Sequence, residues 1–352
     1  MVNLIFNLFL FISIIFVFVS QHWLIVWIWL ESITLSLVVL LQPNLVSCRG
    51  LESVCKYFVA QSVAGVIVLF GALLRFYGEN SFFISGCYTS SCHLVLVLGL
   101  VIKLAVFPSP FWFVDAVGGV PFSRSFYLIV LSKLSPLYLL FSIVDINILF
   151  LLGFVGLISA VTSAILGVNQ SSFRKLLAYS SISNIGWFVV CLPLLSGGLV
   201  IFCVLSYVCM VVPALWAGSH FTFNFMVKSS NLYAAPASKL VLLISLLSLG
   251  GLPPSVGFFF KWVFFQSLLD VSLYWVSAIL IISSLFSLFF YLIMSFNIYS
   301  LNSLTLSGVY YFCLIMLPWY SYWVVSSVLL SLSFDFFHGF ILSSLNLVYI
   351  KN

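Results

Sequence analysis

The sequence has very little charge. Only 5% of its 352 residues are Asp, Glu, Lys or Arg, whereas an average soluble domain is about 25% charged. Hydrophobic residues make up 64% of the chain. A composition of this kind cannot supply the charged surface of a water-soluble domain. The chain is therefore expected to lie within a membrane.

Motifs that hold cofactors are also missing. The eight cysteines form no CxxC pair and no Cys/His cluster with metal-ligand spacing, and no GxGxxG segment is present. We therefore expect no metal, iron–sulfur cluster, flavin, nucleotide or haem on this chain. Cys87 and Cys92 share a predicted loop, where free thiols are favoured, although a disulfide stays open if that loop faces an oxidising compartment.

Long apolar runs dominate what is present. They recur from Leu4 to Leu332, and each is close to the roughly 20 residues that an α-helix needs to cross a bilayer. None shows the alternation of a barrel strand. With only short loops between the runs, residues 1–352 are expected to form a single, all-α membrane domain. We predict about eleven transmembrane helices, at 3–20, 23–41, 56–77, 93–113, 124–143, 147–167, 173–194, 197–219, 239–267, 272–297 and 309–332.

The charges of the short loops predict an orientation. Lys and Arg gather in the loops on the inner side of a membrane. Only Arg75 and Lys351 fall on the side opposite the N-terminus. The side of the N-terminus has seven basic residues, which are Arg49, Lys56, Arg124, Arg174, Lys175, Lys228 and Lys239. We therefore predict an inner N-terminus and an outer C-terminus, and these loop charges need no further role.

Two proline pairs predict broken helices. Pro108 and Pro110 fall in the fourth predicted helix, and Pro253 and Pro254 fall in the ninth. Each proline removes a backbone donor and clashes with the preceding turn, and such breaks in transporters mark the ion or substrate path. The plainer alternative is a proline near a helix end, which suits Pro108 better than Pro253.

The spacing of the breaks predicts an inverted repeat. They lie five helices apart, and an odd number of helices reverses the orientation of a repeat. Residues 1–143 (helices 1–5) and 147–297 (helices 6–10) would form the two inverted units. A last helix and tail, residues 309–352, would follow them.

Four ionisable residues remain after the loop charges are set aside. Each has apolar sequence on both sides, and they are Glu31, Lys103, Lys133 and Lys261. A charge at the bilayer centre costs at least about 2.5–3.5 kcal/mol, so each needs a reason. The structural alternatives are lysines that reach the headgroups and a static ion pair with Glu31.

The functional interpretation of these residues is a proton relay. Burial and a nearby opposite charge act in opposite directions on a side chain's proton affinity, so a moving partner changes which site holds the proton. Glu31 would modulate a paired lysine, Lys103 and Lys133 would form the internal hydrated path, and Lys261 would be its other end. Bridging waters could be held by Ser132, Ser135, Ser181, Ser183 and Asn184, although membrane serines more often bond back to their own helix.

These residues stand in motifs that resemble those of a known family. The chain looks like the subunit 2 family of mitochondrial NADH–ubiquinone oxidoreductase, in the membrane arm of respiratory complex I. Six motifs carry the resemblance in family order: Trp29-Leu-Glu31, Lys56-Tyr57-Phe58-Val-Ala-Gln61, Lys103 to Trp112, Leu131-Ser-Lys133-Leu-Ser-Pro136, Asn169 to Trp187, and Gly250 to Trp262.

The resemblance implies both a fold and an activity. It implies a shortened antiporter-like fold that moves protons across the mitochondrial inner membrane, driven by electron transfer elsewhere, with the N-terminus in the matrix and the C-terminus in the intermembrane space. The family's intramembrane residues fall on Glu31, Lys103, Lys133 and Lys261. NADH, FMN, iron–sulfur clusters and ubiquinone would bind other subunits. The expected partners are other antiporter-like and small membrane-arm subunits and lipids, with no nucleic acid.

The chain departs from the family pattern at three positions. Pro110 replaces a histidine that is often present, Asp115 stands where a glutamate is common, and Asn184 stands where many relatives have histidine. Two other functions stay open. One is a stand-alone cation/proton antiporter, against which the scarcity of buried carboxylates counts. The other is a structural subunit that pumps nothing.

Overall fold

The computed structural model describes residues 2–42, 48–86, 88–144, 148–219, 236–253 and 255–300. Within these ranges the secondary structure is helical apart from one isolated bridge between His22 and Phe83. Seven of the described helices are long and apolar enough to cross a membrane. The predicted helix at 309–332 and the expectations for Cys87 and Pro254 fall outside the described residues. The count of eleven helices stays a prediction.

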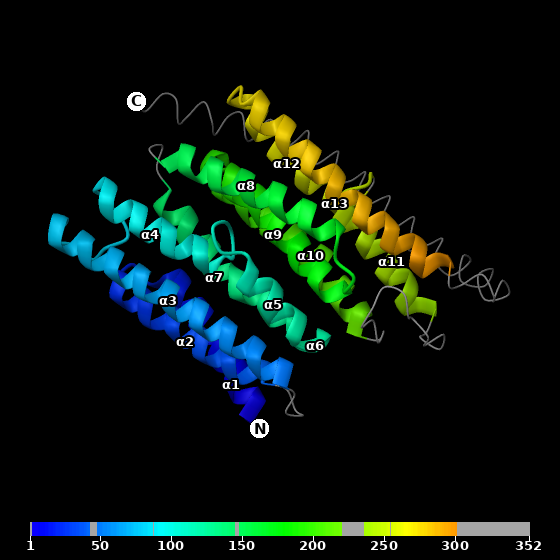
Figure 1. Cartoon of the computed structure of the whole chain (residues 1–352). Helices are drawn as coiled ribbons and strands as arrows, with labels where there is room; N and C mark the ends of the chain where they lie inside the picture. Colours follow the sequence, from blue (N-terminus) through cyan, green and yellow to red (C-terminus); the bar gives the residue numbers. More distant parts are fainter. Residues whose placement is uncertain are drawn as a thin grey trace.

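The first three helices form one side of the molecule (Figure 1). They are α1 (Val2–Val19), α2 (Trp23–Leu41) and α3 (Cys48–Glu79), and α2 packs against both of the others. The predicted start of α3 at residue 56 is wrong, because the helix begins at Cys48. A Glu52–Lys56 ion pair of 2.8 Å, one helical turn apart, lies in this first part. This polar stretch is helical although it precedes the apolar run.

The fourth predicted helix is divided at its proline pair. It consists of α4 (Ser90–Lys103) and α5 (Phe111–Gly119), with non-helical chain between them. Cys92 lies buried inside α4 as a free thiol, so its expected place in a loop is wrong.

The fifth predicted helix contains a change of helix type. The chain passes from α6 (Phe122–Phe126) through a π-helical segment (Tyr127–Leu131) to α7 (Ser132–Ile143). Apolar periodicity gave no sign of the π-helical segment, because all five of its residues are hydrophobic.

The centre of the bundle is α9. It is flanked in sequence by α8 (Leu149–Val168) and α10 (Gly197–Ser219), and α9 itself runs over Phe173–Cys191. Nearly every residue of α9 is buried, because α8, α5 and α12 all pack against it. Residues on α9 are therefore held inside the protein from every side.

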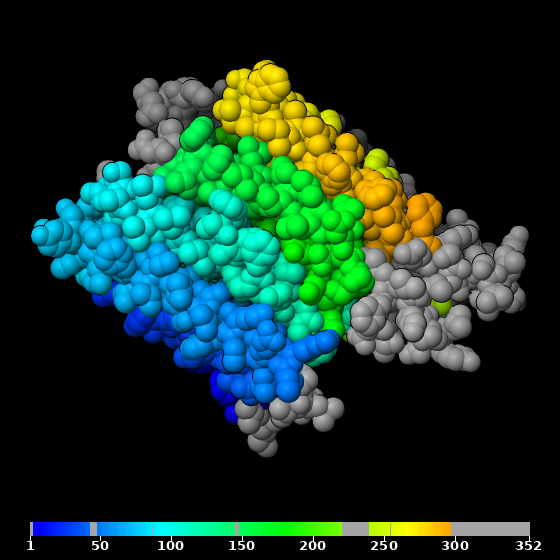
Figure 2. All heavy atoms as spheres, in the orientation of Figure 1, coloured from blue at the N-terminus to red at the C-terminus, as the bar shows by residue number. Residues whose placement is uncertain are grey.

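The remaining described helices cover the other side of the bundle. The ninth predicted helix is divided into α11 (Pro236–Gly250) and α12 (Val256–Asp270), and α13 (Tyr274–Ser300) follows. Figure 2 shows α12 and α13 across the molecule from the first three helices. At the break, Gly251 has a φ of +81°, which suits glycine. A Cβ on Gly257 would lie 1.7 Å from the Ser248 carbonyl oxygen, so this close approach also requires glycine.

Three of the predicted inner-side basic residues lie in contacts between α3, the end of α5 and α9. Lys56 forms an ion pair with Asp115 at 2.9 Å, and Arg174 donates to the Val120 carbonyl at 2.7 Å. The Lys175 side chain lies over Gly118 at the end of α5. These contacts join the first part of α3, the end of α5 and the start of α9.

The opposite end is organised around Arg75. This side chain is fully buried, pairs with Glu79 at 3.2 Å, and donates to the carbonyls of Ile84 and Ser85. Its guanidinium also lies 3.9 Å from the centre of the Tyr88 ring. Burial raises the pKa of the Tyr88 phenol to about 12. The phenol therefore stays protonated at physiological pH and continues to donate to the Ile84 carbonyl.

Candidate functional site

Glu31 on α2 and Lys103 on α4 form an ion pair in which the lysine is buried and the glutamate is half-buried. Glu31 Oε1 and Lys103 Nζ are 3.8 Å apart, and the lysine side chain is only 1% exposed. Neither of these two atoms has a hydrogen-bond partner among the described residues. Lys103 is the last residue of α4, where the helix dipole favours a positive charge. The two charges therefore attract each other without a direct hydrogen bond.

The position of the Glu31 carboxylate depends on Gly65, which has no side chain. A Cβ on Gly65 would lie 1.8 Å from Glu31 Oε1, so only glycine leaves room for the carboxylate against α3. The Thr34 hydroxyl donates to the Glu31 backbone carbonyl at 2.7 Å and is shared with Glu31 Oε2 at 3.2 Å. Trp27 donates to the Gly65 carbonyl at 3.1 Å. Three of these residues lie on α2, so this helix and α3 together fix the carboxylate.

The break after Lys103 is supported by Gln61. Its side-chain nitrogen donates to the Lys103 carbonyl oxygen at 3.2 Å, which satisfies one acceptor that the end of α4 leaves open. Pro108 lies within the non-helical segment, and Pro110 immediately precedes α5. Gln61 belongs to one of the sequence motifs, which predict no role for it. The available signal was an amide side chain within an apolar helix.

Lys133 lies at the start of α7 and is almost completely buried. Its Nζ donates to Ser181 Oγ on α9 at 3.1 Å and lies 4.1 Å from the centre of the Phe113 ring on α5. The aromatic face attracts the positive charge. Among the described residues, no carboxylate forms an ion pair with Lys133. This lysine therefore depends on one hydroxyl and one ring.

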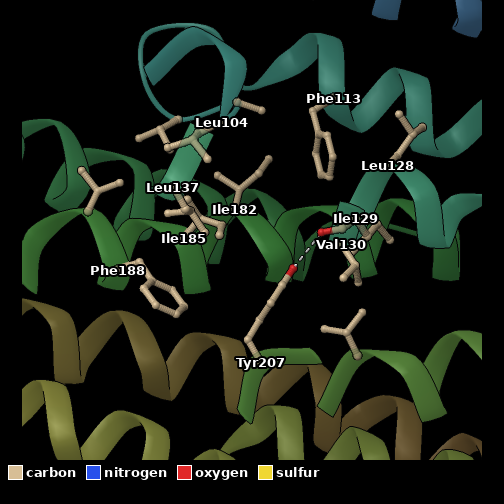
Figure 3. Close-up of a cluster of buried hydrophobic side chains, with 14 of the residues drawn as sticks. Leu104, Phe113, Leu128, Ile129, Val130, Leu137, Ile182, Ile185, Phe188 and Tyr207 are labelled. Atoms are coloured by element: carbon tan, nitrogen blue, oxygen red, sulfur yellow. Dashed lines mark hydrogen bonds between the residues drawn. The ribbon is translucent and has the colours of Figure 1, made fainter. Parts of the chain in front are cut away.

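The π-helical segment before Lys133 makes carbonyls available to side chains. Tyr207 on α10 donates to the Ile129 carbonyl oxygen at 3.3 Å, as the dashed line in Figure 3 shows. Ser132 donates to the Leu128 carbonyl at 2.6 Å. Apolar side chains surround this contact (Figure 3). Both carbonyls accept side-chain donors within a densely apolar region.

Lys261 reaches across the second break. It lies on α12, and its Nζ donates to the carbonyl oxygen of Gly250, the last residue of α11, at 2.9 Å. A Cβ on Gly251 would lie 3.1 Å from this Nζ, so the glycine also provides space for the ammonium. Pro253 lies in the same non-helical segment. Lys103 and Lys261 thus share a setting, since each places a positive charge at the carboxyl end of the first half of a divided helix.

The five polar residues predicted to hold waters are all buried, but only one contacts a lysine. Ser181 accepts from Lys133, whereas the hydroxyls of Ser132 and Ser183 bond back to carbonyls in their own helical turn. For those two the structural alternative is correct. Ser135 and Asn184 are buried without a contact to the four ionisable residues.

The structure thus brings the four ionisable residues into three separate polar contacts. Glu31 pairs with Lys103, Lys133 pairs with Ser181, and Lys261 pairs with a backbone carbonyl. Such an arrangement can hold protons at several separate positions within one membrane domain. It differs from a metal site, since no group of three His, Cys, Asp or Glu side chains comes together in the part of the chain that the structure describes.

Comparisons with known proteins show the family to which the chain is similar. Residues 20–287 match the family described as NADH:quinone oxidoreductase/Mrp antiporter, transmembrane. The NADH-ubiquinone oxidoreductase chain 2 of Pisaster ochraceus is 36% identical over 81% of both chains. That of Patiria pectinifera is 32% identical over 94% of this chain and 91% of its own.

Solved structures share the fold. A chain of respiratory complex I from Thermus thermophilus aligns with a TM-score of 0.78 and 23% identity, covering 84% of this chain and 70% of that chain. A chain of the Mrp complex from Dietzia aligns with a TM-score of 0.73 and 17% identity, covering 84% of this chain and 59% of that chain. The chain therefore belongs to the NADH:quinone oxidoreductase/Mrp antiporter family and, within it, to the chain 2 subunits of respiratory complex I.

Proposed function

We propose that this antiporter-like subunit moves protons through Glu31, Lys103, Lys133 and Lys261. The observation that carries the proposal is the surroundings of Lys133. Within the described part of the chain Lys133 is a fully buried amine without a carboxylate partner, which is costly to keep charged, and a purely structural position would be served better by an apolar side chain. Its single hydroxyl contact gives a proton a direct route toward α9.

The Glu31–Lys103 pair supports a modulating role for the carboxylate. At 3.8 Å the two charges interact strongly, but no direct hydrogen bond locks them together. A small movement of α2 relative to α4 would therefore change their attraction and the tendency of Lys103 to hold its proton. Electron transfer elsewhere in the complex would supply the energy for that movement.

The two divided helices support the inverted repeat of residues 1–143 and 147–297. Lys103 lies at the carboxyl end of α4, and Lys261 binds the carboxyl end of α11. Corresponding half-helix ends in the two units of a transporter commonly hold the transported ion. The repeat would thus place one lysine at each of two equivalent breaks.

The rest of the complex would supply what this chain does not contain. We expect NADH, FMN, iron–sulfur clusters and ubiquinone to bind other subunits, and other membrane-arm subunits and lipids to cover the apolar faces. The relatives are named NADH-ubiquinone oxidoreductase chain 2, and a solved structure that shares the fold is a chain of respiratory complex I. From these names we infer a location in the mitochondrial inner membrane, and from the basic loop residues we infer an N-terminus in the matrix.

A substitution of Lys133 tests the proposed function. Lys133→Met removes the proton site but retains an unbranched chain in the buried space. In the purified complex, whose assembly is checked on a native gel before reconstitution into vesicles, we expect fewer protons pumped per NADH oxidised. Lys56→Met is the control because that lysine is exposed and paired only with surface carboxylates. Unchanged pumping by the fully assembled Lys133 variant would refute the assignment.

A further inference from the structure

The ring of Phe113 is in direct contact with the Lys133 ammonium. Lys133 Nζ lies 4.1 Å from the centre of this ring, well within the roughly 6 Å over which an aromatic face attracts a cation. Lys133 is only 1% exposed and Phe113 is fully buried. Figure 3 shows the Phe113 ring among apolar side chains. The attraction is therefore not weakened by water, and such desolvated contacts are the stronger ones.

The two described contacts of Lys133 respond differently to its protonation. The ammonium has three N–H donors and a neutral amine still has two, so either form can donate to Ser181 Oγ. The face of an aromatic ring attracts the positive charge itself and offers little to a neutral amine. Among the described residues no carboxylate pairs with Lys133 to mask this preference. The ring is thus the contact that favours the charged form.

The ring belongs to the second half of a divided helix. Phe113 lies in the first turn of α5, which begins directly after Pro110. Trp112 packs edge-to-face against it, with ring centres 5.7 Å apart and ring planes at 84°. Lys133 and Ser181 lie on α7 and α9, so three helices meet at this ammonium. The first break therefore takes part in the surroundings of Lys133.

We propose that Phe113 stabilises the proton on Lys133 and thereby sets the pH range over which the subunit pumps. Lys133 forms one N–H bond when it takes up a proton and breaks one when it releases it. The ring stabilises the charge between these two events and exchanges no proton itself, so Phe113 is a positioning residue. The inference rests on the proposed function of Lys133. With 38 phenylalanines in the chain, the sequence does not distinguish this one from the others.

Other titratable groups on the surrounding helices do not contact Lys133. Within the described part of the chain, none of them forms an ion pair, hydrogen bond or cation–π contact with it. They are Glu31 on α2, Cys92, His93 and Lys103 on α4, Asp115 on α5, Tyr127 in the π-helical segment, and Arg174, Lys175, Tyr179 and Cys191 on α9, whereas α1 contains none. These groups are unchanged in the variants below, so they contribute equally to every pH profile.

Removal of the ring tests the inference in the assembled complex. Phe113→Leu retains an apolar side chain without an aromatic face. After assembly is checked on a native gel, protons pumped per NADH oxidised are measured in vesicles across a range of pH. We expect the alkaline limb of the profile, where Lys133 loses its proton, to move to lower pH by about 0.5–1.5 units. Phe113→Tyr retains the ring and should therefore keep the profile of the unmodified complex.

Phe188→Leu is the matched control. Phe188 is also fully buried, and its ring packs against Phe260 and Phe264, with no cation over it among the described residues. We expect its pH profile to match that of the unmodified complex. If Phe113→Leu has the same profile as this control, or if Phe113→Tyr shifts as far as Phe113→Leu, the inference is overturned.

A second variant decides the matter if Phe113→Leu does not assemble. Phe113→Met fills the space with a flexible side chain that has no ring, and we expect the same shift to lower pH. An unshifted profile would overturn the inference.

Lys133→Met separates this inference from the proposed function. If Lys133→Met pumps normally, the proposed function fails. If Lys133→Met pumps less while the Phe113 variants keep the unmodified profile, the proposed function stands and only the role of Phe113 is refuted.

Discussion

A methyl group at the crossing of α8 and α9 should disturb both stability and the Lys133 contact. A Cβ on Gly156 would lie 2.6 Å from Val190 Cγ2, 2.8 Å from the Gly186 carbonyl oxygen and 3.0 Å from the Val190 nitrogen. Two of these three atoms belong to the backbone of α9 and cannot rotate away. Gly156→Ala therefore forces the helices apart.

The size of the displacement follows from these distances. Ordinary contact of a Cβ begins at 3.4 Å, so the Gly186 carbonyl must move by about 0.6 Å, and overpacking of this kind typically costs about 1–3 kcal/mol. Ser181 lies on the same helix and is 3.1 Å from Lys133 Nζ. A shift of about 0.6 Å in either direction would take this contact outside ordinary hydrogen-bond geometry.

Gly153 provides a control on the same helix. A Cβ there would meet nothing within 4 Å, and alanine in place of glycine within a helix is favourable by roughly 0.5–1 kcal/mol. Detergent-solubilised complex would be heated in steps, and the fraction that stays assembled would be measured on a native gel. We expect Gly156→Ala to lose assembly at a lower temperature than the unmodified complex, and Gly153→Ala to match or exceed it. Equal midpoints for the two variants would refute the close-packing explanation.

Two further substitutions test other parts of the fold. Gly65→Ala would place a Cβ 1.8 Å from Glu31 Oε1. We expect the carboxylate to be displaced from Lys103 and proton pumping to fall in a complex that still reduces ferricyanide. Normal pumping would contradict this role of Gly65. Arg75→Met removes two hydrogen bonds to loop carbonyls, and bonds from a charged donor contribute about 1.5 kcal/mol or more each. We expect faster proteolysis at residues 80–89, with Glu79→Gln as a milder comparison, and an unchanged cleavage rate would argue against this anchoring.

The sequence was sufficient to predict which side chains are buried when that burial depends only on the apolar residues around them. Apolar flanks predicted that Lys103 and Lys133 lie inside the protein, and both are at most 2% exposed. The helices before and after each proline pair also follow from local chemistry, because proline cannot continue the hydrogen-bond ladder. The family was predicted from its motifs, and this prediction is confirmed. The roles of the four ionisable residues stay predictions.

Features that depend on how helices pack against one another could not be predicted from the sequence. Several serines lie on α9, and their identity alone does not show that Ser181 is the one facing Lys133. The role of Gln61 requires that α3 and the end of α4 meet, which hydropathy does not specify. The helical part of α3 before Lys56 was missed because it is polar rather than apolar. These details arise from packing between distant segments, to which apolar periodicity along the chain is insensitive.

The π-helical segment sets the angular position of Lys133 around its helix. Each residue of an α-helix advances the chain by about 100° about its axis, and a π-helical turn contains about one residue more than an α-helical turn. The side chains after Leu131 are therefore rotated, relative to Phe122–Phe126, away from where a continuous α-helix would place them. If the same residues formed a continuous α-helix, the Lys133 side chain would be turned by about 100° away from Ser181. The helix type of this segment is thus as important to the site as the identity of its residues.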